Sequence, residues 1–238
     1  MLKNTFYFLV FISTFLWNNI SAQDSSYTAY NSYLIGKVKS WDCPYFKTFD
    51  EGGRSFYLHT KAYKALMEMK VAAKKDGIDL TLKSAGRSFY YQKQIWEKKF
   101  DRCIANETDS LECVKQILKY SAMPGTSRHH WGTEIDLNNL NFEYFESGYG
   151  KKVKIWLDNN ANTFGFCQVY DNQSYSHRLG YNYEPWHYSY TPVSKQLLLD
   201  FNKRIDYTHI TGFSGDKYAQ ELEIIKKFVN GIGFICHP

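Results

Sequence analysis

The chain has 238 residues, of which 44% are hydrophobic, and its 29 basic and 24 acidic residues give a formal net charge of +5. This length and apolar content are typical of one globular domain with a single sizeable core. The charges are spread along the sequence without a basic block, so we expect no nucleic-acid partner.

The first 22 residues have the three-part layout of a secretory signal peptide. Lys3 precedes the apolar run TFYFLVFISTFLW at 5–17, and small residues end the segment at Ala22. The apolar run is shorter than the roughly 20 residues that a membrane-spanning helix needs. We therefore expect cleavage before Gln23 and an exported protein of the periplasm, the cell-wall space or the medium, without an integral membrane segment. An uncleaved anchor is the alternative.

Helices and short strands are interleaved along the rest of the chain. Apolar residues at helical spacing indicate helices, and alternation of apolar and polar residues indicates half-buried strands. In chain order we predict a helix at 60–75, a strand at 78–86, helices at 90–100 and 111–120, a strand at 133–138, a helix at 151–165, strands at 166–170 and at the end of 184–190, and two amphipathic helices after 194. Helices mixed with strands on one small sheet predict an α+β fold.

Five cysteines follow the predicted cleavage site, in a compartment that permits disulfides. An odd number leaves at least one thiol free. Cys103 and Cys113 flank a polar segment between two predicted helices, so we expect a disulfide between them. Cys167 lies in the apolar stretch FGFCQVY and is expected to be a buried thiol. Cys236 is a potential partner for Cys43, although spacing alone leaves these pairings open.

The segment GTSRHHWGTEIDL at 125–137 combines histidines and carboxylates beside a predicted strand. Alternation along that strand puts Glu134 and Asp136 on one face, directed into a cleft. A catalytic zinc ion usually takes three protein ligands, histidine and carboxylate among them, and keeps one position for water. The best third ligand is His187 in EPWHYSY. We therefore predict one zinc ion bound by His129, Asp136 and His187.

Glu184 lies three residues before His187. A carboxylate beside a zinc-activated water takes its proton and hands it to a leaving amine, so we expect Glu184 to be the catalytic base. Arg87 follows a predicted strand and is expected to act on an oxyanion or a terminal carboxylate, because guanidinium groups form two parallel hydrogen bonds with carboxylates. His130 lacks such support, and we expect a structural role for it.

These segments resemble two signatures of the VanY-like D-alanyl-D-alanine carboxypeptidases. SRHHWGTEID is similar to S-x-H-x-x-G-x-x-x-D, EPWH is similar to E-x-x-H, and the resemblance covers roughly residues 58–192. The family belongs to a wider group of zinc peptidases that includes lysostaphin-type enzymes and the hedgehog fold. The resemblance implies the same three ligands and the same base. It also implies substrate contacts for Arg87, Gln92 and Ser127.

The resemblance further implies a small, mainly antiparallel sheet with helices packed around it, as in the hedgehog and D-Ala-D-Ala peptidase folds. The resulting division is a signal peptide at 1–22, an N-terminal segment packed on the domain at 23–57, a zinc peptidase domain at 58–192 and a helical extension at 193–238. Two positions depart from the family pattern. Glu134 stands where many members have alanine, and Ser189 stands where many have arginine, which leaves the substrate preference open.

By this resemblance the protein is expected to be an exported zinc-dependent D,D-carboxypeptidase that acts on peptidoglycan stem peptides ending in D-alanine. An L,D-carboxypeptidase and an endopeptidase that cleaves cross-links are alternatives on the same site. A non-catalytic peptidoglycan-binding module on the same scaffold is a further alternative. Glu184 argues against that module, because binding alone does not need a base.

Overall fold

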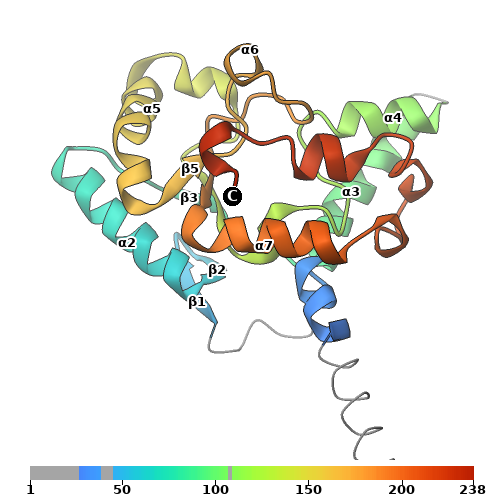
Figure 1. The fold of residues 1–238 in the computed structure, drawn as a ribbon. Helices are drawn as coiled ribbons and strands as arrows, with labels where there is room; N and C mark the ends of the chain where they lie inside the picture. Colours follow the sequence, from blue (N-terminus) through green and yellow to red (C-terminus); the bar gives the residue numbers. More distant parts are fainter. Residues whose placement is uncertain (1–26, 39–44, 107–108) are drawn as a thin grey trace, which may run out of the picture.

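The computed structural model describes residues 27–38, 45–106 and 109–238, so the predicted signal peptide and Cys43 lie outside the described residues. In chain order the elements are β1 (Phe46–Glu51), β2 (Arg54–His59), α2 (Thr60–Lys75), β3 (Leu82–Ser84), α3 (Phe89–Ile104), α4 (Ser110–Ile117), β4 (Glu134–Leu137), α5 (Gly148–Asn160), β5 (Phe166–Gln168), α6 (Gln173–Ser176), β6 (His187–Tyr190) and α7 (Thr191–Arg204) (Figure 1). Residues 27–34 are also helical. None of the helices in these described ranges has the length and apolar character needed to cross a membrane.

The described strands form two antiparallel sheets, and the predicted α+β fold is confirmed. β1 and β2 make a two-stranded hairpin, and the larger sheet has the order β3-β4-β6-β5. The central strands β4 and β6 pair so that Asp136 lies opposite His187 and Glu134 lies opposite Ser189. Residues that are opposite in a pair, or two apart on a strand, share a face. One face at the centre of the sheet therefore carries four polar side chains.

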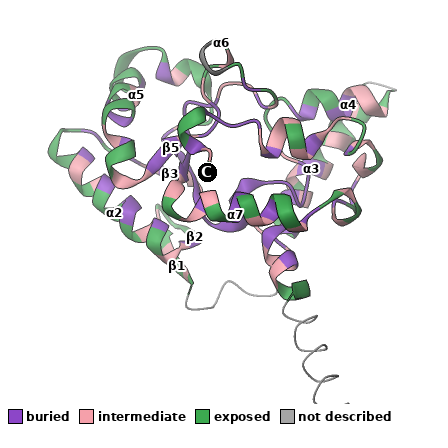
Figure 2. Ribbon diagram, viewed as in Figure 1, coloured by how far each residue is buried: buried purple, intermediate pink, exposed green. Residues whose placement is uncertain are grey.

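The other face of the sheet packs against the main hydrophobic core. Ile135 and Tyr188, which lie opposite each other on β4 and β6, point to this side together with residues of α2 and α5. The inner faces of both helices are buried and their outer faces are exposed (Figure 2). The predicted helix at residues 60–75 is confirmed at both ends. Its residues Leu66 and Met69, three positions apart, are both buried in this core.

α7 and the C-terminal segment cover part of the polar side of the sheet (Figure 1). Leu198 and Phe201 of α7 pack in a second buried cluster with Cys167 of β5. Only the first of the two helices predicted after residue 194 is regular. The second prediction is wrong: Glu223 adopts a φ of 51°, which interrupts a helix, and a short π-helix at Ile225–Val229 follows it.

Two disulfides tie the described chain together. The predicted bond between Cys103 and Cys113 is present and joins α3 to α4. The prediction that Cys167 is a buried free thiol is wrong, because Cys167 bonds to Cys236 and holds the C-terminal segment against β5. Its apolar neighbours correctly indicate burial, but the partner lies 69 residues further along the chain.

The hairpin of β1 and β2 was not predicted from the sequence. Gly52 and Gly53 occupy its turn with φ values of 57° and 74°, a left-handed pair that glycine adopts without strain. β2 continues from residue 54 to residue 59 and thus runs across the predicted boundary between residues 57 and 58. The hairpin packs beside the segment that carries the site, since a Cβ on Gly132 would come within 2.5 Å of the Phe46 ring.

Candidate active site

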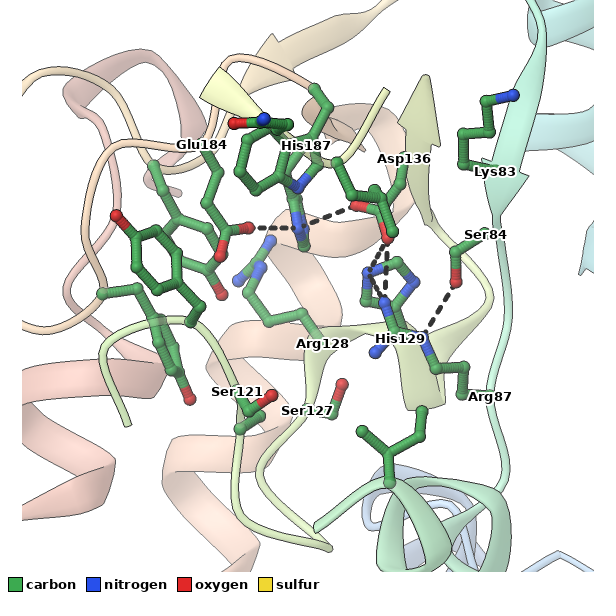
Figure 3. A pocket seen from close by; sticks show the side chains of 18 of the residues that line it. Lys83, Ser84, Arg87, Ser121, Ser127, Arg128, His129, Asp136, Glu184 and His187 are labelled. Carbon is green, nitrogen blue, oxygen red and sulfur yellow. Dashed lines mark hydrogen bonds and ion pairs between the residues drawn. The ribbon is translucent and has the colours of Figure 1, made fainter. Parts of the chain in front are cut away.

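A cleft of about 600 Å³ opens over the polar face of the larger sheet. Its lining includes Arg87, Ser127, His129, Asp136, Glu184 and His187 (Figure 3). Five separate segments contribute these side chains: the loop after β3, the short helical turn before β4, β4 itself, the loop before β6, and β6. The structure therefore brings the predicted ligands, the predicted base, Arg87 and Ser127 together in one place.

His129 lies in a 3₁₀ turn at Arg128–Trp131 that ends at Gly132, whose φ is 68°. The turn buries the ring and directs Nε2 toward Asp136 Oδ2, 3.4 Å away. Nδ1 lies 2.6 Å from the carbonyl oxygen of Ala85. Since a carbonyl oxygen only accepts, Nδ1 carries the proton and Nε2 keeps its lone pair. Burial lowers the pKa of His129 to about 4, which keeps the ring neutral at pH 7.

His187 is surrounded by three carboxylates. Its Nδ1 lies 3.2 Å from Asp136 Oδ1 and 3.2 Å from Glu184 Oε2, and its Nε2 lies 3.1 Å from Glu134 Oε2. Burial opposes the charged ring, but the interactions with the three carboxylates prevail and hold the pKa of His187 well above its usual value. The site thus favours a positive charge between these side chains.

The residues present fit a metal ion. Donor atoms of His129, Asp136 and His187 lie within 4.8 Å of one another. Asp136 Oδ1 is buried and makes no hydrogen bond, although it is close to His187 Nδ1. Two imidazole nitrogens and one carboxylate oxygen are the donor set of many catalytic zinc sites, which leave a fourth position open. A cation bound by these three residues would meet both the unpartnered oxygen and the surrounding negative charge.

Glu184 is buried at the edge of this donor set, in the loop that precedes β6. The backbone N–H of Glu184 donates to the carbonyl oxygen of Tyr170, which anchors the loop. Burial raises the pKa of the Glu184 carboxyl above its usual value. A carboxyl with a raised pKa accepts and returns a proton more readily near neutral pH, as a general base and acid must.

The Arg87 guanidinium reaches across the cleft to two of the predicted ligands. Its Nη2 donates to Asp136 Oδ2 at 2.9 Å and lies 2.8 Å from His129 Nε2. Its Nε donates to Ser84 Oγ at 2.9 Å, at the end of β3. The Arg87 side chain is 18% exposed, so part of it still faces the cleft.

Gln92 takes a different place from the one that the sequence predicts. It is fully buried on α3 and does not line the cleft. Its Oε1 accepts a hydrogen bond from Arg87 Nη1 at 3.0 Å, and its Nε2 donates to the carbonyl oxygen of Ala122 at 2.8 Å. Gln92 therefore lies behind Arg87 and holds the guanidinium in position.

His130 has the structural position that its sequence context predicts. Its Nδ1 lies 2.7 Å from the carbonyl oxygen of Arg87, and its Nε2 accepts from the backbone N–H of Gly125 at 3.1 Å. Burial lowers its pKa to about 3, so the ring is neutral. His130 joins the segment before the 3₁₀ turn to the loop that carries Arg87.

Two charged residues of the site were missed or left without a role in the sequence analysis. Glu134 does share a strand face with Asp136, but it is fully buried beneath His187 and does not line the cleft. Arg128, which is 2% exposed, forms an ion pair with it at 3.3 Å. The available signal was an arginine and a glutamate within one otherwise buried segment, where each charge needs a partner.

Comparison with known proteins gives a consistent result. A D-alanyl-D-alanine carboxypeptidase of Enterococcus faecalis is 30% identical over 128 residues, which make up 54% of this chain and 46% of that protein. The chain spans about half the length of the curated relatives that it matches.

Two solved structures have similar folds. VanYB in complex with D-alanine-D-alanine is 25% identical with a TM-score of 0.51, over 67% of this chain and 90% of that chain. A vancomycin-resistance D,D-pentapeptidase VanY variant in complex with Zn(II) is 23% identical with a TM-score of 0.52, over 76% of this chain and 92% of that chain.

The sequence model of the VanY D-alanyl-D-alanine carboxypeptidase family matches residues 55–193, which is more than half of the chain. This span contains the three clustered donors His129, Asp136 and His187, as well as Glu184. The chain therefore belongs to the VanY family of D-alanyl-D-alanine carboxypeptidases.

Proposed function

We propose that this protein is an exported, zinc-dependent D,D-carboxypeptidase that removes the terminal D-alanine from peptidoglycan stem peptides. One observation carries the proposal: in a member of the VanY family, donor atoms of His129, Asp136 and His187 converge in a cleft beside the carboxylate of Glu184. The structure of the relative VanYB in complex with D-alanine-D-alanine supports the class of peptide.

In this reaction a water molecule attacks the scissile peptide carbonyl. Zinc held by His129, Asp136 and His187 supplies Lewis acidity for activating the water and polarising that carbonyl. Glu184 takes the proton from the attacking water and donates it to the leaving amine of D-alanine. Its buried position beside the donor set supports both steps, because the raised pKa allows the carboxyl to hold the proton between them.

The cationic lining of the cleft suits a peptide that ends in a carboxylate. Arg87 is fixed by Ser84 and Gln92, and it remains partly open to the cleft. It binds either the terminal carboxylate or the oxyanion that forms at the scissile carbon. Lys83 and Lys99 also line the cleft and add positive charge around it.

Export is part of the proposal. The predicted signal peptide supports it, and so do the two disulfides of the described chain, because disulfides persist in oxidising compartments outside the cytosol. The same location gives the enzyme access to peptidoglycan.

The test uses the chain from Gln23 onward with three muropeptides: a pentapeptide ending in D-Ala-D-Ala, a tetrapeptide ending in one D-alanine, and a cross-linked dimer. Products are identified by mass spectrometry with zinc, with a chelator, and with zinc restored. The proposal predicts release of one D-alanine from the pentapeptide, lost with the chelator and regained with zinc. A zinc-loaded protein that leaves the pentapeptide intact contradicts it. Preferential shortening of the tetrapeptide would identify an L,D-carboxypeptidase, and cleavage of the dimer an endopeptidase.

A further inference from the structure

A buried ion-pair network lies next to His187, on the Nε2 side of its ring. Glu134 and Ser189 are fully buried, and Arg128 is 2% exposed. Glu134 and Ser189 lie opposite each other on β4 and β6, next to the pair formed by Asp136 and His187. The network and two of the predicted metal ligands thus share four adjacent positions on one face of the sheet.

The two carboxylate oxygens of Glu134 have different partners. Oε1 accepts from Ser189 Oγ at 2.7 Å and from Thr133 Oγ1 at 3.2 Å, and it lies 3.3 Å from Arg128 Nη2. Oε2 faces His187 Nε2 at 3.1 Å. Because all three of these donors contact Oε1, Oε2 is free to accept from the histidine ring. Because an ionised carboxylate only accepts, the proton between Oε2 and Nε2 belongs to the histidine.

We infer that Glu134 is a positioning residue: through Oε2 it keeps a proton on Nε2 of His187, so that Nδ1 is the nitrogen that gives up its proton and binds the metal ion. The inference rests on the proposed function only in that the site binds zinc. Nδ1 already points toward Asp136 Oδ1, at 3.2 Å. Carboxylates that accept from the second nitrogen of a metal-bound histidine fix its tautomer and orientation in this way.

A purely structural ion pair explains the network less well. Nε and Nη1 of Arg128 are buried without hydrogen-bond partners, although the guanidinium stacks over Trp131 at 4.6 Å. Such an incompletely satisfied pair gives little or no stability compared with apolar side chains of similar size. What apolar side chains cannot provide is the acceptor for His187 Nε2.

The substitution Glu134→Gln tests this role with little change in shape. Arg128, Ser189 and Thr133 all donate on the Oε1 side, so they hold the amide oxygen there and leave the amide NH₂ facing His187 Nε2. Nε2 must then accept, which moves the ring proton to Nδ1 and opposes metal binding. We expect the zinc affinity of the metal-free protein, measured by competition with a chromogenic chelator, to fall about 10- to 100-fold.

Two further variants distinguish a loss of His187 positioning from a general loss of structure. Ser189→Ala removes one donor to Oε1 but leaves the contact between Oε2 and His187, so its zinc affinity should stay within about threefold of the parent value. Adding Arg128→Met to Glu134→Gln frees the amide to turn its oxygen toward His187, which should recover much of the lost affinity. Thermal unfolding of each metal-free variant reports whether it is folded.

The inference is overturned if folded Glu134→Gln binds zinc as tightly as the parent, or if Ser189→Ala loses as much affinity as Glu134→Gln. Should Glu134→Gln fail to fold, ¹⁵N NMR of the zinc-loaded parent decides, because a proton on Nε2 of His187 supports the inference and a proton on Nδ1 overturns it. Zinc affinity is measured without substrate. A protein that shows the predicted zinc affinities but releases no D-alanine would refute the proposed reaction alone.

Discussion

The two histidines of the site are held in different ways. The ring of His129 is fixed by a backbone carbonyl, that of Ala85, at 2.6 Å. The ring of His187 is fixed by a side chain, that of Glu134, at 3.1 Å, and Glu134 in turn depends on Arg128. A substitution of Ala85 leaves its backbone carbonyl in place, whereas a substitution of Glu134 removes the carboxylate that accepts from His187. One side of the site is therefore set by the path of the main chain, and the other is open to change by mutation.

Removal of either histidine should have the largest effect on zinc binding and activity, and the effect should be equal for His129 and His187. His129→Ala and His187→Ala each take one of three donors from the site, so zinc content after dialysis and release of D-alanine should both fall to background. Metal analysis and the pentapeptide assay measure these losses, and circular dichroism checks folding. One zinc ion per chain in either folded variant would show that the histidine in question is not a ligand.

Glu184→Gln should separate chemistry from metal binding on the His187 side. The amide keeps the shape of the side chain but cannot take a proton, so kcat/KM should fall by about 10²- to 10⁴-fold. Zinc affinity should change little, because Glu184 is not among the three proposed ligands. Steady-state kinetics with the pentapeptide and chelator competition measure the two quantities. Near-parental turnover in Glu184→Gln would assign the base to another group.

Acid unfolding should show how much the ionised Glu134 contributes to the stability of the fold. Burial opposes ionisation of Glu134, but Arg128 and the hydrogen bonds from His187 and Ser189 lower its pKa to about 2 from 4.5. A depressed carboxyl pKa gives stability that is present above pH 4.5 and is lost as the pH falls through the folded value. At about 1.4 kcal/mol per pKa unit, roughly 2 kcal/mol of this contribution is lost between pH 6 and pH 3.

Urea unfolding of the metal-free protein at these two pH values measures that loss. The pH dependence of Glu134→Gln should be shallower than that of the parent. His129, whose pKa is lowered to about 4 by burial, also costs stability in acid, but it does so in both proteins and cancels in the comparison. Identical slopes for the two proteins would mean that Glu134 is not an ionised, paired group in the fold.

Gln92→Ala should have the smallest effect. It removes the hydrogen bond from Arg87 to Gln92 Oε1, and a hydrogen bond to a charged group is worth about 1.5–3 kcal/mol. We expect kcat/KM to fall by about tenfold or somewhat more, since Arg87 would be held less firmly. Gln94→Ala on the exposed side of the same helix is the matched control and should behave like the parent. Equal kinetics for the two variants would leave Gln92 without a role in positioning Arg87.

The sequence allowed the predicted ligands to be identified because each lies in a short local motif. His129 and Asp136 are seven residues apart, and Glu184 and His187 are three apart. The chemistry of such a set restricts the residue types and spacings, so a pattern in one chain is enough to place all four in one site. The helix at 60–75 was predictable for a similar reason, since its apolar spacing and its ending at the Asp-Gly pair are both local.

What escaped prediction depends on contacts between distant segments. The contact of Glu134 with His187 follows from the register of β4 on β6, which places Glu134 diagonally across from a residue 53 positions away. The bond between Cys167 and Cys236 spans 69 residues. In both cases the local sequence indicates a buried polar or sulfur group, but it does not indicate which distant side chain is its partner.

The most direct test of the site is a zinc-loaded crystal structure with anomalous diffraction measured at the zinc edge. We expect one peak in the cleft, coordinated by His129 Nε2, Asp136 and His187 Nδ1, with the Glu184 carboxylate beside the ion and Glu134 bonded to His187 Nε2. A peak that lies away from these three side chains, or one that is bound by His187 through Nε2, would contradict it.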